Sequence, residues 1–233
     1  MTLGPTPDAL AENAARLDAV MLAPVDDAPT LARILDDPRL TALCLGPGLG
    51  HARARELVPV ALSARRATVL DADALAAFSG APAALLDHLH PATILTPHDG
   101  EFARLFPDLA RRLKAPIGEG APYSRLDAAR EAARRAGCTV LLKGPDTLIA
   151  APDGRARLNA ACFERAAPWL ATAGAGDVLA GLIAGLLARG LDPFEAASHA
   201  AWLHVEAARR IGPGLIAEDL PEALPAVLGA LKA

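Results

Sequence analysis

The chain lacks any apolar run long enough to span a membrane. Its longest candidate, residues 178–187, is interrupted by Gly181 and Gly185, whereas a membrane-spanning helix needs about 20 consecutive apolar residues. The start of the sequence also lacks a basic segment followed by an apolar stretch, so it predicts no secretory signal. From these absences we expect no membrane contact and a cytoplasmic location.

The sequence also lacks an excess of basic residues and has few cysteines. Its formal net charge is -4, and its basic residues are scattered instead of forming the cationic stripe that nucleic-acid phosphates require. We therefore expect no nucleic-acid partner. The three cysteines, Cys44, Cys138 and Cys162, are far apart, and two of them lie in apolar strand-like runs. Such thiols are expected to pack as small hydrophobic groups in a reducing compartment.

Apolar residues, by contrast, are abundant: 52% of the 233 residues are hydrophobic, which suits one α/β domain over residues 1–233. Short β-branched or Leu-rich runs alternate with Ala-rich stretches, a pattern typical of a mostly parallel sheet flanked by helices. We predict strands near 41–45, 67–71, 92–96 and 138–142, and a hairpin between 143 and 160. Helices are predicted at 8–17, 28–36, 51–63, 99–106, 123–136, 175–189, 193–210 and 221–231. Residues 107–122 are predicted to form a surface excursion.

The sharpest motif is a loop of small residues that runs into an Ala- and Leu-rich helix, with the sequence LATAGAGDVLAG from Leu170 to Gly181. Its glycines allow close backbone approach. The free N–H groups at the helix start and the helix dipole favour a phosphate bound at Gly174, Ala175 and Gly176. Asp177 lies in the first helical turn. From the loop alone, it is equally an acid that complements the dipole or a general base.

Three successive predicted strands end in polar or glycine-rich segments. These are GPGLG at 46–50, DADAL at 71–75 and TPHDGEF at 96–102. Ligands of open α/β sheets bind outside the carboxyl ends of the strands, so the segments are candidates for one site. Each also has a simpler explanation in helix capping, with Thr96 or Asp99 as an N-cap and Glu101 as a first-turn acid.

A fourth predicted strand is followed by a short polar segment made of Lys143, Gly144, Pro145, Asp146 and Thr147. Lys143 is able to hold a phosphate as a point charge, and Gly144 permits close backbone approach. The alternative is a strand-end lysine followed by an ordinary turn at Pro145. The segment alone favours neither reading.

Taken together, these motifs resemble in order and spacing the signatures of the NAD(P)H-hydrate dehydratases of the ribokinase-like superfamily. The similarity extends over nearly the whole chain, and it implies a ribokinase-like fold. It implies that Gly50 and His98 contact the hydrated nicotinamide nucleotide. It also implies that residues 143–147 and 174–176 bind the adenine nucleotide and that Asp177 takes the proton of a substrate hydroxyl.

The activity implied by this resemblance is removal of water from hydrated NADH or NADPH, driven by hydrolysis of ADP or ATP with Mg²⁺. Because water is a poor leaving group, the substrate hydroxyl deprotonated by Asp177 would attack the terminal phosphoryl group, and phosphate would then leave. Two alternatives stay open. One is a kinase of the same fold that acts on a small alcohol, such as a vitamin precursor; the other is a non-catalytic nucleotide-binding protein. The TPHDGE segment favours the dehydratase.

Two segments depart from the family pattern. Many relatives have a Gly-Asn pair before the small-residue loop, whereas this chain has AAPW at 166–169, so the wall on the nucleotide side is expected to differ. Relatives also begin with a strand, a Gly-rich turn and a helix before the strand that Thr2 and Leu3 start. We therefore expect a domain shortened at its N-terminus and less active. Its exposed sheet edge would be covered by a homo-oligomer partner or by a rearranged segment 1–20.

Overall fold

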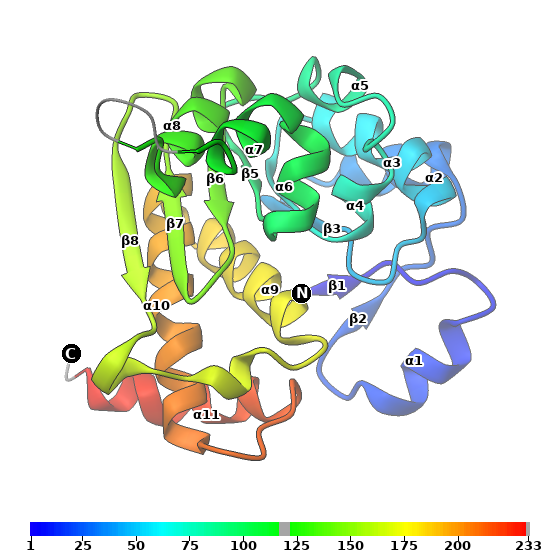
Figure 1. Ribbon diagram of the computed structural model, residues 1–233. Coiled ribbons are helices and arrows are strands. Elements are labelled where there is room, and N and C mark those ends of the chain that lie inside the picture. The colour runs from blue at the N-terminus through cyan, green and yellow to red at the C-terminus, as the bar shows by residue number, and fades with distance from the viewer. Residues whose placement is uncertain (117–121, 232–233) are drawn as a thin grey trace.

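The centre of the computed structural model, which describes residues 1–116 and 122–231, is a six-stranded sheet. Its order is β3-β4-β5-β6-β7-β8 (Figure 1). Strands β3 to β6 are parallel, whereas β7 is antiparallel to both β6 and β8. The mostly parallel sheet and the hairpin, which is β7–β8, are therefore confirmed. The strand bounds are Ala42–Leu45, Ala67–Leu70, Thr93–Leu95, Thr139–Leu142, Asp146–Ala150 and Ala156–Ala160.

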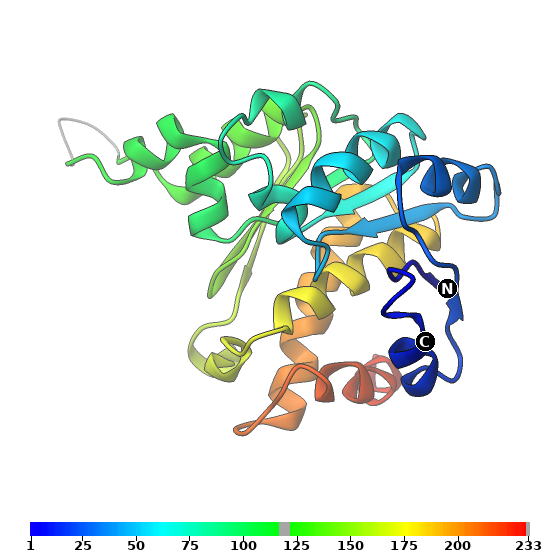
Figure 2. The same ribbon diagram turned by 90° about the vertical axis from the view of Figure 1, so that its right-hand side faces the viewer.

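Helices cover both faces of the sheet because side chains alternate along its buried strands. Leu70 and Leu95 point into one apolar cluster, while their neighbours Val69 and Ile94 point into the other. Figure 2 shows the two helix layers on opposite sides of the sheet. The first layer contains α3 (His51–Ser63), α4 (Asp73–Ala76), α5 (Ala83–Leu86), α6 (Asp99–Leu105), α7 (Pro107–Leu113) and α8 (Arg125–Ala136). The second contains α9 (Ala175–Ala188) and α10 (Pro193–Ile211), against which α11 (Asp219–Ala230) packs.

All eight predicted helices are present, but the surface excursion predicted over 107–122 is wrong for its first part. Pro107–Leu113 forms α7, and Leu109 is fully buried. Proline at the first helical position starts a helix instead of breaking it, because its missing N–H has no helical partner there. Residues 117–121 lie outside the described residues. In the part of the chain that is described, no helix is long and apolar enough to cross a membrane.

The N-terminal segment forms a small unit beside the main sheet, at the lower right of Figure 1. Here β1 (Thr2–Leu3) and β2 (Met21–Leu22) make a two-stranded parallel sheet. They are joined by α1 (Leu10–Arg16), a fully described helix that buries none of its residues. After β2, α2 (Ala28–Leu35) packs against α3. The strand expected at the start of the chain is present, but within the described structure it does not extend the main sheet.

Strand β3 is an edge of the main sheet in the described part of the chain. This position explains why one cysteine prediction is wrong. Cys138 is buried as expected, whereas Cys44 in β3 is exposed. An edge strand leaves one side without a neighbouring strand, so its side chains are covered less completely than those of β4 or β5.

Candidate active site

The four loops that follow the parallel strands lie at one end of the sheet, the end where those strands have their carboxyl termini. The start of α9 lies at the same end (Figure 1). Backbone hydrogen bonds continue past the strand ends. The Asp71 N–H donates to the Leu45 carbonyl over 3.1 Å, and the Lys143 N–H donates to the Pro97 carbonyl over 2.9 Å. Segments that are separate in the sequence are therefore brought together by strand pairing.

The GPGLG and DADAL segments are locked to each other. Gly46 has a φ of +133°, and a Cβ atom there would lie only 1.7 Å from the Asp71 carbonyl oxygen. The Gly46 and Asp71 backbones therefore cross so closely that only glycine fits at position 46. The Gly50 N–H donates to Asp73 Oδ2 over 2.8 Å, and His51 Nε2 lies 3.5 Å from Asp73 Oδ1. Gly50 is thus exposed at the predicted substrate side with its N–H already engaged.

A partly buried ion pair joins the second and fourth loops. Lys143 Nζ lies 2.6 Å from Asp71 Oδ1 and 3.9 Å from Glu101 Oε2. Asp71 is 1% exposed, and among the described residues its Oδ2 has no hydrogen-bond partner. Ala72 beside it has a φ of +44°, a strained conformation that occurs mostly at functional sites. This pair was not anticipated from the sequence, because its members are 72 residues apart.

The start of α9 faces this ion pair. A Cβ atom on Gly176 would lie 3.5 Å from Lys143 Nζ and 4.0 Å from Asp71 Oδ2. Gly174 is the N-cap, in the left-handed conformation, and the first turn of α9 follows it at the same end of the sheet. In that turn the Ala175 N–H donates to the Thr172 carbonyl over 3.4 Å. Backbone donors, a helix dipole and a lysine thus converge, which is the chemistry of an anion site.

Asp177 lies in the first turn of α9, beside these groups. Its pKa is raised above the ordinary value, chiefly by desolvation, then by the charge of Asp71 and to a smaller degree by that of Asp73. The Lys143 charge acts in the opposite direction. A carboxylate with a raised pKa is a stronger base once ionised, which suits proton abstraction.

His98 is the N-cap of α6, so the alternative of Thr96 or Asp99 as the cap is wrong. Its Nδ1 accepts hydrogen bonds from the Gly100 N–H at 2.9 Å and the Glu101 N–H at 3.4 Å. The Glu101 carboxylate accepts the His98 N–H in return, which completes a capping box. Because Nδ1 is the acceptor, a neutral imidazole carries its proton on Nε2. The His98 side chain is 56% exposed, and its Nε2 lies 3.6 Å from Glu101 Oε1, too far for a hydrogen bond.

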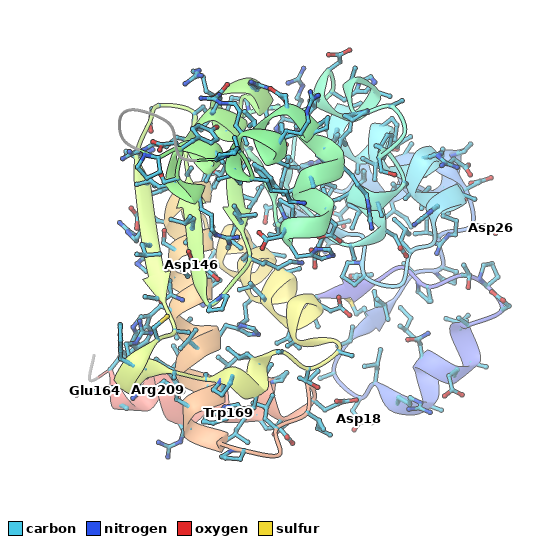
Figure 3. All side chains as sticks on the ribbon, in the orientation of Figure 1. Asp18, Asp26, Asp146, Glu164, Trp169 and Arg209 are labelled. Atoms are coloured by element: carbon cyan, nitrogen blue, oxygen red, sulfur yellow. The ribbon has the colours of Figure 1, made fainter. Side chains whose placement is uncertain are left out.

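The predicted nucleotide segment builds the turn into β7. Thr147 Oγ1 donates to the Gly144 carbonyl over 2.8 Å, and the Pro145 carbonyl accepts the Ala161 N–H over 2.7 Å. Asp146, labelled in Figure 3 at the start of β7, forms an ion pair with Arg125. These contacts give the segment a fixed shape at the same edge as the α9 loop.

Two buried or half-buried residues near the site carried no recognisable signal in the sequence. Arg125 begins α8 and reaches the turn after β6. His204 on α10 is 8% exposed, and its pKa is lowered to about 4, chiefly by burial. A backbone contact with Ala175 opposes this shift, and the Lys143 charge adds to it. His204 therefore lies under the α9 loop as a neutral imidazole.

The AAPW segment, where the chain departs from many relatives, packs onto α10. Ala167 is buried, and Trp169, labelled in Figure 3, donates its indole N–H to the Ala208 carbonyl over 2.9 Å. The segment therefore anchors the chain just before the α9 loop.

Comparisons with known proteins agree with this arrangement. The family model described as NAD(P)H-hydrate dehydratase matches residues 2–225. A bifunctional NAD(P)H-hydrate repair enzyme from Gloeobacter violaceus is 38% identical over 224 residues, which cover 92% of this chain. The similar region spans 41% of the length of that relative.

Solved structures give the same result. The ADP/ATP-dependent NAD(P)H-hydrate dehydratase from Bacillus subtilis, co-crystallised with ATP and Mg²⁺, superposes with a TM-score of 0.77 at 27% identity. That match covers 99% of this chain and 79% of the other. Ribokinase from Arabidopsis thaliana, at 16% identity, shares the fold with a TM-score of 0.55, covering 96% of this chain and 80% of the other. The ribokinase-like fold is thus confirmed, and the chain belongs to the NAD(P)H-hydrate dehydratase family.

Proposed function

We propose that this chain restores NADH and NADPH from their hydrates in a reaction driven by ADP or ATP. The observation that carries the proposal is the convergence of Asp177, the N-terminal turn of α9 and the Asp71–Lys143 pair at one edge of the sheet. Family membership supports the same reaction, because the B. subtilis relative is an ADP/ATP-dependent NAD(P)H-hydrate dehydratase.

In the proposed mechanism, Asp177 removes the proton of the substrate hydroxyl. The hydroxyl oxygen attacks the terminal phosphoryl group of the nucleotide, so an O–P bond forms and the phosphoanhydride bond breaks, giving AMP from ADP or ADP from ATP. Phosphate then leaves with the original hydroxyl oxygen, and a proton is lost from the adjacent ring carbon. This restores the ring double bond. The raised pKa of Asp177 favours the first proton transfer.

Charge on the transferring phosphoryl group would be stabilised by groups that are already in place. The N–H groups of Gly174 and Gly176 offer donors at the start of α9, where the N–H of Ala175 donates to the Thr172 carbonyl over 3.4 Å. Lys143 lies beside them with its ammonium group held by Asp71. Preorganised donors need no reorientation during the reaction, which is the main source of electrostatic catalysis. Residues 143–147 would line the nucleotide, while Gly50 and the Nε2 atom of His98 would contact the nicotinamide substrate.

Mg²⁺ bound with the nucleotide phosphates fits the residues present. In the described residues, no cluster of three or more His, Cys, Asp or Glu side chains forms a metal site, but Mg²⁺ commonly uses one or two carboxylates plus phosphate oxygens and water. Asp71 offers a buried carboxylate oxygen without a partner among the described residues. The ion would supply charge neutralisation for the phosphoryl group, and Asp71 is the side chain that would hold it.

A turnover assay tests the proposed function. The chain is incubated with hydrated NADH and either ADP or ATP, and both NADH absorbance and free phosphate are measured. Equal amounts of NADH and phosphate, formed only when nucleotide is present, are the expected result. A stable phosphoester with no NADH would identify a small-alcohol kinase type of reaction instead, and nucleotide binding without any turnover would overturn catalysis.

We also propose a homo-oligomeric state and a cytoplasmic location. The exposed edge strand β3 and the exposed side chains of Met1 and Met21 support an association surface near the N-terminal segment. Light scattering on the purified chain tests the first of these proposals, with a mass above one chain expected. Fractionation of cells that express the full-length protein tests the second.

A further inference from the structure

Arg125 connects two loops of the proposed site that approach it from different strands. Its Nη1 pairs with Asp99, the first residue of α6 and the neighbour of His98. Its Nη2 donates to the Lys143 carbonyl over 3.1 Å, and its Nε lies 3.3 Å from Asp146 Oδ2. One guanidinium thus contacts both the start of α6 and the turn after β6.

The position of Arg125 is not explained by the stability of its own helix. It is the first residue of α8, where a positive charge opposes the helix dipole. The helix start is already satisfied by a capping box between Ser124 and Asp127, with bonds of 3.0 and 3.1 Å. This cap fixes the direction from which Arg125 enters the site. The side chain is 26% exposed, so most of it lies between the two loops.

Gly144 makes room for this guanidinium. A Cβ atom at position 144 would lie 2.7 Å from Arg125 Nη2 and 3.1 Å from Asp146 Oδ1. The sequence predicted that another group would come close to the backbone of Gly144. In the structure, the Arg125 guanidinium is the group that does so. The turn offers the guanidinium a carbonyl, which accepts the Nη2 N–H, and the Asp146 carboxylate, which pairs with it by charge without accepting a hydrogen bond from Nε. The smaller ammonium of a lysine would not contact both groups and Asp99 together.

We propose that Arg125 is a positioning residue that sets the spacing between His98, on the nicotinamide side, and Lys143, on the phosphate side. This inference rests on the proposed function for the roles of those two residues. Phosphoryl transfer between two bound reactants requires both to be held in attack geometry. The Lys143 N–H already donates to the Pro97 carbonyl where the two loops leave the sheet. Arg125 adds a side-chain link between the start of α6 and the turn after β6, and this link fixes how the two loops face each other.

Kinetics of a matched set of variants test this role. Arg125→Met and Arg125→Lys are expected to lower kcat by about 10- to 100-fold. A small displacement of one reactant from the in-line attack geometry slows phosphoryl transfer by this order. Asp99→Asn, which weakens only the α6 contact, is expected to raise KM for hydrated NADH more than KM for the nucleotide. Asp146→Asn is expected to show the reverse. Arg130→Met is the control, since Arg130 lies on the same helix and, in the part of the chain that the structure describes, its side chain donates to the Gly154 carbonyl of the distant β7–β8 turn.

Hydrogen exchange separates failure of this inference from failure of the proposed reaction. In Arg125→Met, the backbone amides of residues 99–102 and of residues 143, 144, 146 and 147 should exchange faster than in the wild type, whether or not the chain turns over hydrated NADH. Arg130→Met should leave both segments unchanged. Equal exchange of both segments in the wild type and Arg125→Met would overturn the inference, and so would faster exchange spread over all of α8 and the sheet. An Arg125→Lys variant that keeps wild-type exchange and kinetics would also overturn it.

Discussion

The carboxyl edge of the main sheet and the N-terminal segment of residues 1–22 are built in opposite ways. At the carboxyl ends of the strands, Asp71 and Glu101 are buried carboxylates, and the lysine beside them follows β6, 72 residues beyond Asp71 in the sequence. In the N-terminal segment, the fully described helix α1 buries no residue, and Met1 and Met21 are 88% and 65% exposed. Dense packing is what allows costly features such as a partly buried charge pair and a strained Ala72 to persist. Mutational effects should therefore be concentrated at the edge.

The largest effect is expected for the proposed base. Asp177→Asn should lower kcat by about 10²–10⁴-fold, the usual contribution of a general base. It should leave ADP affinity nearly unchanged, because no backbone donor of the α9 turn is lost. Turnover measures the first effect and calorimetry the second. A fall in kcat of less than about tenfold would show that Asp177 is not the base.

The backbone crossing at Gly46 should be the most sensitive point for folding. Gly46→Ala is expected to cost about 3 kcal/mol or more of unfolding free energy, since its Cβ would overlap the Asp71 carbonyl. Gly48→Ala is the matched control in the same turn, with a φ of +62° and no described atom within 4 Å. It should cost only about 1–2 kcal/mol for the left-handed conformation. Urea denaturation compares the two, and equal losses would show that the crossing does not limit stability.

The buried His204 should make the folded chain less stable in acid. Its pKa is about 4 in the folded chain, below the ordinary value of 6.5. As the pH falls, His204 therefore takes up a proton in the unfolded chain before it does so in the folded chain. The free energy of unfolding decreases as the pH drops from about 6.5 to about 4. The loss is on the order of 3 kcal/mol at the lower end. His204→Gln should remove this part of the acid loss.

The control for that measurement is on the same helix. The His199 side chain is 56% exposed, so His199→Gln should keep the wild-type loss of stability in acid. His90, also buried and with a lowered pKa, acts in the same direction and remains in both variants. Denaturation curves at several pH values between 7.5 and 4 provide the comparison. Identical pH profiles for the wild type and His204→Gln would contradict the prediction.

A smaller and more selective effect is expected at His98. Replacement by Asn keeps a good N-cap for α6 but removes the exposed Nε2 atom. His98→Asn should raise KM for hydrated NADH by about tenfold, as expected for one lost hydrogen bond, and leave the stability and the ADP affinity near wild type. Steady-state kinetics with each reactant varied in turn will measure this. An equal loss of both affinities would place His98 on the nucleotide side.

The smallest effect is expected in the N-terminal segment. Ala14 and Ala15 in α1 are exposed, so replacing either by Gly should cost under about 1 kcal/mol, the propensity difference alone. Activity should not change. Ala132→Gly in the buried face of α8 is the counterpart, and it should cost more because packing is also lost. If the Ala14 variant lost as much stability as the Ala132 variant, the contrast between the two regions would be wrong.

Most of the fold was accessible from local patterns, and the omissions have physical causes. The two four-residue helices α4 and α5 are too short to show a helical period. Helix α7 was missed because the whole segment 107–122 was predicted to be a surface excursion from its proline, glycine and charged residues, whereas Pro107 starts a helix. The N-cap role of His98 was missed because histidine seldom caps a helix, and it depends on the ring presenting Nδ1 to the backbone.

By itself, the sequence determined the class of fold, the strands of the main sheet and the main helices, and the motifs that mark the strand ends. Those features depend on hydrophobic period and on the local chemistry of glycine, proline and carboxylates. Only the tertiary structure decided which of the marked residues meet. The Asp71–Lys143 pair, the crossing at Gly46 and the contacts of Arg125 depend on which strands are neighbours. Strand order is set by packing over the whole chain, and no local segment of the sequence encodes it.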